Sequence, residues 1–287
     1  MNLVRIASSG AEAVIAPGRG GALLRLQIDG RDVLRPAPCH ATDPLEMACF
    51  PLVPYANRIA HGQFRFDGQN YRLPRNFGAH PHSLHGVGWT SHWSVEAATA
   101  NCATLVHDHA GTADWPWAYR AVQIIRIYAD SLAMTLSVRN CAGTPAPAGL
   151  GFHPYFTASK AMRLRFTAAG LWQSAAPDWL PLDHDRADAL GNWSDGAPAT
   201  GTTLIDNCYS GWSGIATLDD DNEQSVSLTA EGATWLHLYR PPDAHFVCLE
   251  PVSHMPDAIN RTGGMPVLAS GEERRLAMRI AVRPLSA

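Results

Sequence analysis

The fold class follows from the stretch YRAVQIIRIYADSLAMTLSVRN, residues 119–140. Apolar and polar residues largely alternate along 119–128 and again along 131–140, and this two-residue period is typical of strands with one buried face. Ala129 and Asp130 leave room only for a tight turn between the two runs, which predicts an antiparallel pair. The stretch therefore favours a protein built from antiparallel β-strands.

Shorter segments of the same kind are spread along the chain. Asp29-Gly30 follows the alternating run GALLRLQI (21–28), and Asp67-Gly68 separates FRF (64–66) from QNYRL (69–73). An Asp-Gly pair between such runs predicts a hairpin, because both central residues of a type I′ turn need a positive φ. Further strands are expected over 162–166, 225–230, 234–239, 245–250 and 274–282.

Signals for helices are weak in this sequence. One or two turns are expected over 181–190 and a single turn over 256–260. Strands that follow one another with short connections favour a sandwich of antiparallel sheets. We therefore predict an all-β fold in which residues 1–287 form one domain with long functional loops.

Composition limits the possible partners. The formal net charge is −4 and the chain has no run rich in Lys and Arg, which argues against nucleic acid and membrane surfaces as partners. The six cysteines include no C-x-x-C pair, so we expect buried free thiols. The start of the chain lacks the features of a signal peptide, and no run of about 18 apolar residues is present. A soluble, cytoplasmic protein is the expectation.

Two segments place a titratable residue directly before a proline. His153 lies in GFHPYF (151–156) and Glu250 lies in FVCLEP (246–251). A residue before proline is held in an extended conformation, and proline is expected to end a central strand. We expect both side chains to be fixed at the rim of a sheet. The alternatives are a hydrogen-bonded core histidine and a solvated glutamate.

A third polar segment, HPHSLHG (80–86), contains His80, His82 and His85. These histidines could hold a metal ion, but His-x-x-His without a matching third ligand is a weak signal, and we expect no metal requirement. Arg58, in the segment NRI (57–59), could bind a ligand or form a surface ion pair.

Taken together and in order, these motifs resemble the aldose 1-epimerase family, the galactose mutarotase-like proteins. The resemblance runs in register over nearly the whole chain. The matching segments are Asn57-Arg58-Ile59, Phe64 to Gly68 with Leu73 and Asn76, His82-x-x-His85-Gly86, Gly151-x-His153-Pro154-Tyr155-Phe156, Glu250-Pro251, and Pro256-Asp257-Ala258-x-Asn260.

The resemblance implies a β-supersandwich and interconversion of the α and β anomers of a free aldose without a cofactor. It implies that Glu250 is the general base and His153 the general acid. Arg58 and His85 match substrate-binding positions, and Asn57 and His82 lie close to them in the sequence. The segment LIDNCYSGW (204–212) makes Asp206 the candidate for a substrate-binding aspartate.

The sequence departs from the family pattern at two places, and other functions remain as alternatives. The segment His85-Gly86-Val87-Gly88 replaces the paired glycines of many members, and the Asp206 segment matches loosely. A hexose-6-phosphate 1-epimerase would need further arginines, for which Arg75, Arg163 and Arg165 are the candidates. A sugar-binding protein without activity and a histidine-based metalloenzyme are the remaining alternatives. The sequence names neither the sugar nor the oligomeric state.

Overall fold

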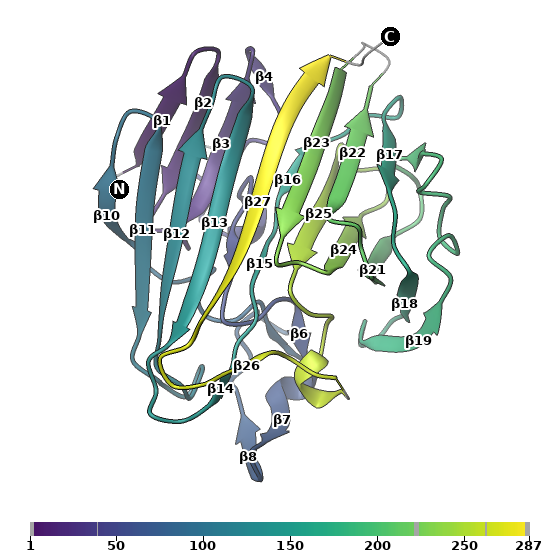
Figure 1. Ribbon diagram of the computed structural model, residues 1–287. Helices are drawn as coiled ribbons and strands as arrows, with labels where there is room; N and C mark the ends of the chain where they lie inside the picture. The colour runs from purple at the N-terminus through teal and green to yellow at the C-terminus, as the bar shows by residue number, and fades with distance from the viewer. Residues whose placement is uncertain (1–2, 39, 221–223, 262, 285–287) are drawn as a thin grey trace.

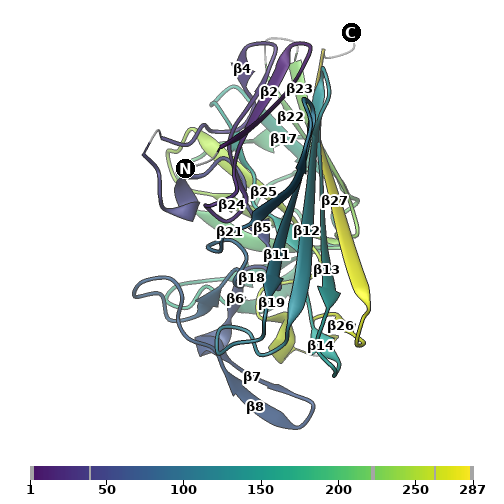
Figure 2. The ribbon, with the colours of Figure 1, turned by 90° about the vertical axis from the view of Figure 1, so that its left-hand side faces the viewer.

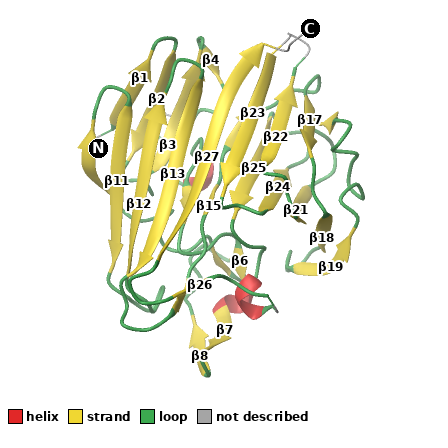
Figure 3. Ribbon diagram, viewed as in Figure 1, coloured by secondary structure: helices red, strands yellow, loops and turns green. Residues whose placement is uncertain are grey.

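The computed structural model describes residues 3–38, 40–220, 224–261 and 263–284. Strands dominate these residues (Figures 1 and 3). Helical structure in this part of the chain is limited to three short 3₁₀ segments, η1 (Pro44–Glu46), η2 (Ala60–Gly62) and η3 (Ala258–Asn260). No helix among the described residues is long and apolar enough to cross a membrane.

Two large antiparallel sheets form the layers of the molecule (Figure 2). The nine-stranded sheet contains, in spatial order, β10 (Ser94–Ala98), β11 (Cys102–His109), β12 (Tyr119–Ile127), β13 (Ser131–Asn140), β27 (Glu273–Pro284), β23 (Gln224–Glu231), β22 (Ile215–Asp219), β17 (Arg163–Phe166) and β20 (Ala197–Pro198). The eight-stranded sheet contains β19 (Pro181–Asp185), β18 (Gly170–Ser174), β21 (Ile205–Ser210), β24 (Trp235–Arg240), β25 (Phe246–Val252), β15 (Gly151–Phe152) and β5 (Pro51–Leu52), with β16 (Tyr155–Thr157) also paired to β25.

Smaller sheets complete the fold. A four-stranded meander contains β1 (Val4–Ser8), β2 (Ala11–Ala16), β3 (Ala22–Ile28) and β4 (Arg31–Asp32), and the two-stranded pairs are β6 (Arg58–Ile59) with β9 (Ser83–Leu84), β7 (Gln63–Phe66) with β8 (Gln69–Arg72), and β14 (Ala146–Pro147) with β26 (Val267–Leu268). Every pair between these strands is antiparallel. The architecture is the antiparallel all-β sandwich that the sequence predicts.

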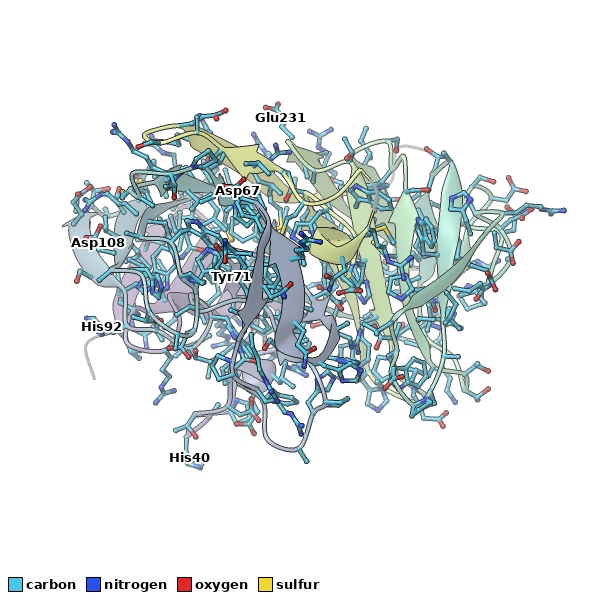
Figure 4. The ribbon with its side chains drawn as sticks, turned by 90° about the horizontal axis from the view of Figure 1, so that it is seen from below. His40, Asp67, Tyr71, His92, Asp108 and Glu231 are labelled. Carbon is cyan, nitrogen blue, oxygen red and sulfur yellow. The ribbon has the colours of Figure 1, made fainter. Side chains whose placement is uncertain are left out.

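The two predicted Asp-Gly hairpins are confirmed. Asp29 and Gly30 have φ values of 50° and 74°, and Asp67 and Gly68 have values of 48° and 75°. Figure 4 looks from the end at which the β7–β8 hairpin projects, with Asp67 and Tyr71 labelled on it. The strand pair over 119–140 also forms, with β12 and β13 in continuous register.

One local prediction is wrong. Residues 181–185 form β19 and not a helix, because this segment pairs with the edge of the eight-stranded sheet at β18. The predicted turn over 256–260 is present as η3. Of the cysteines, Cys49, Cys208 and Cys248 are buried free thiols, whereas Cys102 is half-buried and Cys141 is exposed. Cys39 lies outside the described residues.

Alternation along β24 and β25 gives the eight-stranded sheet two different faces. Leu236 and Leu238 belong to the main hydrophobic core, as do Val247 and Leu249. The alternate residues of both strands point to the other face, where Tyr239, Cys248 and Val252 belong to a second hydrophobic cluster. A strand that buries both faces needs apolar neighbours on each, and any polar group on the second face must find a partner there. His237 and Glu250 lie on this second face.

Candidate active site

The second face of the eight-stranded sheet carries a cavity of about 420 Å³. Its volume is within the range of ligand sites in proteins, about 300–1,000 Å³. The lining residues are Arg35, Leu45, Asn57, Arg58, Phe77, His80, Leu84, His85, His153, Tyr155, Trp179, Leu204, Asp206, His237, Tyr239, Phe246 and Glu250. A second cavity of about 480 Å³ lies elsewhere, beside Pro17 and Trp93, and its ionisable lining residues are Arg19 and His92. The convergence of titratable groups makes the first cavity the candidate site.

Glu250 lies in the interior of the eight-stranded sheet. Its strand β25 continues through Pro251 to Val252, so the prediction that proline ends the strand at a sheet rim is wrong. Ser253 N–H donates to Leu150 O. Because successive N–H groups point alternately to the two sides of a strand, the Pro251 nitrogen faces the same neighbouring strand as Ser253 N–H. On that side β16 pairs only as far as Cys248, and β15 begins to pair at Val252. The missing N–H therefore falls in a gap between two partner strands.

His153 lies in the two-residue connection between β15 and β16, and this connection is not paired with a neighbouring strand. Its backbone N–H donates to Phe50 O, which ties this connection to the neighbouring segment. The imidazole packs against the ring of Phe50, at a centroid distance of 4.6 Å, and against the ring of Tyr155, at 4.7 Å. The aromatic residues around His153 thus hold the ring in one orientation.

His153 and Glu250 meet on the floor of the cavity. His153 Nε2 lies 3.3 Å from Glu250 Oε1, and both side chains are buried. Burial raises the pKa of Glu250 well above its usual value, and the charge of Asp206 raises it further. Burial lowers the pKa of His153 to about 3, and the neighbouring His237 adds to this effect. The two groups therefore favour sharing a single proton near neutral pH.

Arg58 and Asp206 form a buried ion pair beside this floor. Arg58 Nη2 donates to Asp206 Oδ2 at 2.8 Å, and Arg58 Nη1 donates to Asn57 Oδ1 at 3.0 Å. Burial would raise the pKa of Asp206, but the hydrogen bond from His237 and the charge of Arg58 outweigh it and hold this pKa well below its usual range. Arg58 is therefore part of the cavity wall and not a surface ion pair.

Asn57 and His85 are joined by a reciprocal pair of bonds. Asn57 N–H donates to His85 Nδ1 at 3.1 Å, and His85 N–H donates to Asn57 O at 2.8 Å. Burial lowers the pKa of His85 well below its usual value, so the ring is neutral. Since Nδ1 accepts a bond, the ring proton is on Nε2, and His85 can donate to a ligand. A Cβ on the next residue, Gly86, would lie 2.4 Å from Val53 O, so this close approach requires glycine.

His82 is placed differently from the other predicted residues. It is buried but is absent from the cavity lining. Its Nδ1 accepts a bond from His61 N–H at 3.0 Å, and its Nε2 lies 2.9 Å from Asp178 O. Both ring nitrogens of His82 are engaged by backbone groups, so neither is left to bind a ligand. No group of three or more His, Cys, Asp or Glu side chains among the described residues is arranged to hold a metal ion.

The cavity also contains residues that sequence reasoning missed. His237 donates from Nε2 to Asp206 Oδ1 at 2.7 Å and lies directly across from Glu250 in the strand register. The guanidinium of Arg35 stacks on Tyr155, at 4.0 Å, and Phe246, at 4.5 Å. A polar residue between two leucines in TWLHLY was the available signal for His237, because alternation places it on the face opposite the core.

Comparison with known proteins shows the family of the chain. The family model described as aldose 1-epimerase matches residues 2–281. The chain is 30% identical over 289 residues to the uncharacterized protein YphB of Escherichia coli K12, an alignment that covers 96% of this chain and 97% of that protein.

Solved structures show the same fold. A crystal structure from Escherichia coli K12, whose name assigns it only provisionally as an aldose 1-epimerase, superposes with a TM-score of 0.91 at 29% identity over 99% of both chains. A galactose mutarotase-like protein from Clostridium acetobutylicum superposes with a TM-score of 0.85 at 19% identity over 98% of this chain and 95% of that one. The chain belongs to the aldose 1-epimerase family.

Proposed function

We propose that this protein is an aldose 1-epimerase, a mutarotase that interconverts the α and β anomers of a free aldose. The contact between His153 and Glu250 on the floor of the cavity is the observation that carries the proposal. In the substrate, O1 and the ring oxygen O5 are bonded to the same carbon. A base for the O1 proton and an acid for O5 must therefore lie close together, as these two side chains do.

Ring opening needs one proton to leave O1 and another to reach O5. Glu250 takes the O1 proton while protonated His153 donates from Nε2 to O5, and the C1–O5 bond breaks as the C1=O1 bond forms. Rotation about C1–C2 exposes the other face of the aldehyde. Closure by the reverse transfers gives the other anomer and restores both groups. The cycle is redox-neutral and its protons balance, so it needs no cofactor.

Burial favours this transfer. Before ring opening the pair is a carboxylate beside an imidazolium, and after it both groups are neutral. A low-dielectric environment disfavours the charged forms, which is the direction of the pKa shifts of Glu250 and His153. Relative to the reactive carboxylate–imidazolium form, the neutral pair that follows ring opening is therefore lower in energy. Positioned acid and base groups each typically contribute about 10²–10⁴-fold.

The hexose-6-phosphate alternative has less support. Arg163 and Arg165 lie on β17 of the nine-stranded sheet, and Arg75 is absent from the cavity lining. Within the cavity, Arg58 is paired with Asp206, and Arg35 donates to the carbonyl oxygens of Leu45 and Met47. The test is a polarimetric screen of freshly dissolved aldoses, each with and without a 6-phosphate. Faster equilibration of at least one free aldose is expected, and acceleration only of phosphorylated sugars would favour the alternative.

The rate of mutarotation is expected to have a bell-shaped dependence on pH. Only the singly protonated pair contains both an acid and a base. Lowering the pH adds a second proton and removes the base, whereas raising the pH removes the only proton and with it the acid. The two limbs report macroscopic pKa values of the His153–Glu250 pair. Polarimetry after subtraction of the spontaneous rate measures the profile, and a rate independent of pH would contradict the mechanism.

Arg58→Ala is expected to reduce both stability and substrate binding. Removing the guanidinium leaves the Asp206 carboxylate buried without its counter-ion, which lowers the free energy of unfolding by about 3 kcal/mol. Loss of hydrogen-bond donors in the cavity should raise KM. Urea unfolding and polarimetric kinetics measure the two effects. Arg58→Ala with Asp206→Asn is the control and should recover most of the stability; unchanged stability in Arg58→Ala would show that the pair contributes little.

A further inference from the structure

Four side chains in the cavity wall form a closed ring of contacts. Asn57 Oδ1 accepts from Arg58 Nη1, and Arg58 Nη2 donates to Asp206 Oδ2. Asp206 Oδ1 lies 2.7 Å from His237 Nε2, and His237 Nε2 lies 3.3 Å from Asn57 Nδ2, which closes the ring. The chain contributes these residues from β6, β21 and β24, and from the residue before β6, so the ring connects distant parts of the fold.

The chemistry of the ring fixes the position of one proton. Asp206 receives a bond from a guanidinium on one oxygen, and an ionised carboxylate can only accept hydrogen bonds. His237 Nε2, at 2.7 Å from its other oxygen, must therefore carry a proton. The Asn57 oxygen is identified by its two bonds from Arg58 N–H groups, so the amide nitrogen faces His237. The last contact in the ring is consequently between two donors.

This mismatch leaves an unused donor in the cavity. Asn57 Nδ2 cannot donate to a ring nitrogen that already carries a proton, and it makes no other hydrogen bond to the described residues. Asn57 is nearly buried and lines the cavity. A buried N–H without an acceptor is unfavourable, so an oxygen that enters the cavity would be bound there. His85 Nε2–H is a second donor of the same kind.

We propose that His237 is a positioning residue for sugar recognition: its Nε2–H holds the Asp206–Arg58 pair in place and leaves the Asn57 amide to bind a substrate hydroxyl oxygen. The proposal rests on the proposed mutarotase function. His237 takes no part in the proton transfers to O1 and O5, which are assigned to Glu250 and His153. Its loss should therefore affect binding more than turnover.

The kinetic test compares two substitutions at this position. His237→Leu removes the donor and should raise KM about 10- to 100-fold, as expected for loss of a hydrogen bond to a charged group, with a much smaller change in kcat. His237→Gln places an amide N–H near the position of Nε2 and should keep KM close to the wild-type value. His107→Leu, in the nine-stranded sheet, is the control for loss of a buried histidine. Equal losses in His237→Gln and His237→Leu would overturn the proposal, as would a fall in kcat alone.

Coupling to Asp206 separates a specific role from a general disturbance of the cavity. In an Asp206→Asn background, His237→Leu should raise KM little further, because residues that act through one contact are not additive. A full additional increase would show that His237 acts independently of Asp206. Calorimetric titration with the aldose provides the same comparison for binding affinity without turnover.

The proton position can be measured without any reaction. In ¹⁵N-labelled protein near neutral pH, the imidazole spectrum of His237, assigned by its absence in His237→Gln, should show a protonated Nε2. Protonation on Nδ1 alone would overturn the inference even if the protein is an active mutarotase. If His237 shows the expected tautomer but the protein neither accelerates anomer exchange nor binds an aldose, the proposed function is refuted, and the role of His237 in sugar recognition is refuted with it.

Discussion

Glu250→Gln is expected to lower kcat for anomer interconversion by about 10²–10⁴-fold, the contribution of one positioned proton-transfer group. Glutamine keeps the shape of the side chain and its place beside His153 but cannot take the O1 proton. KM should change little, because the groups assigned to hydroxyl binding lie on other segments. Polarimetry at saturating aldose, corrected for the spontaneous rate, measures the loss.

The same substitution should not destabilise the protein at neutral pH. Burial raises the pKa of Glu250 in the folded state, so the folded protein binds a proton more readily than the unfolded chain. The stability of the wild type therefore falls as pH rises through the range between the two pKa values. Glutamine is neutral throughout, and its melting temperature should equal or exceed that of wild type near pH 8. Glu231→Gln, on the exposed end of β23 and labelled in Figure 4, is the control. Near wild-type turnover in Glu250→Gln would refute the mechanism.

His153→Asn is expected to reduce kcat by a similar factor, about 10²–10⁴-fold, because the ring oxygen loses its proton donor. The double substitution of His153 and Glu250 should lose less than the product of the two single losses, since residues that act as a unit are not additive. His92→Asn, at an exposed position labelled in Figure 4, is the control for histidine removal. Fully multiplicative losses would indicate that the two residues act in separate steps.

The local sequence predicts most strands because alternation and turn chemistry act over a few residues. The β7–β8 hairpin follows from Asp67-Gly68, where both residues adopt a positive φ. The segment 181–185 was missed because its pairing with β18 is a tertiary effect. Pro251 continues its strand only because two other strands leave a gap beside it, and no local signal contains that information.

The residues of the candidate site also fall into those that the sequence predicts and those that only the structure shows. The local sequence and the resemblance to a family together point to His153, Glu250, Asn57, Arg58, His85 and Asp206, and all of them line one cavity. His82 shares their motif, but its ring nitrogens are engaged by backbone groups of distant segments. His237 is part of an ordinary-looking strand, and its importance appears only when the register places it beside Asp206 and Glu250.

Exchange of anomers at equilibrium tests the central claim most directly. Two-dimensional NMR exchange spectroscopy on an aldose observes magnetisation passing between the α and β anomeric protons, without any coupling enzyme. We expect catalytic amounts of the wild-type protein to produce exchange cross-peaks for at least one free aldose, and the double substitution of His153 and Glu250 to produce none above the spontaneous level. Exchange that is equally fast with the wild type and with the doubly substituted protein would contradict the account.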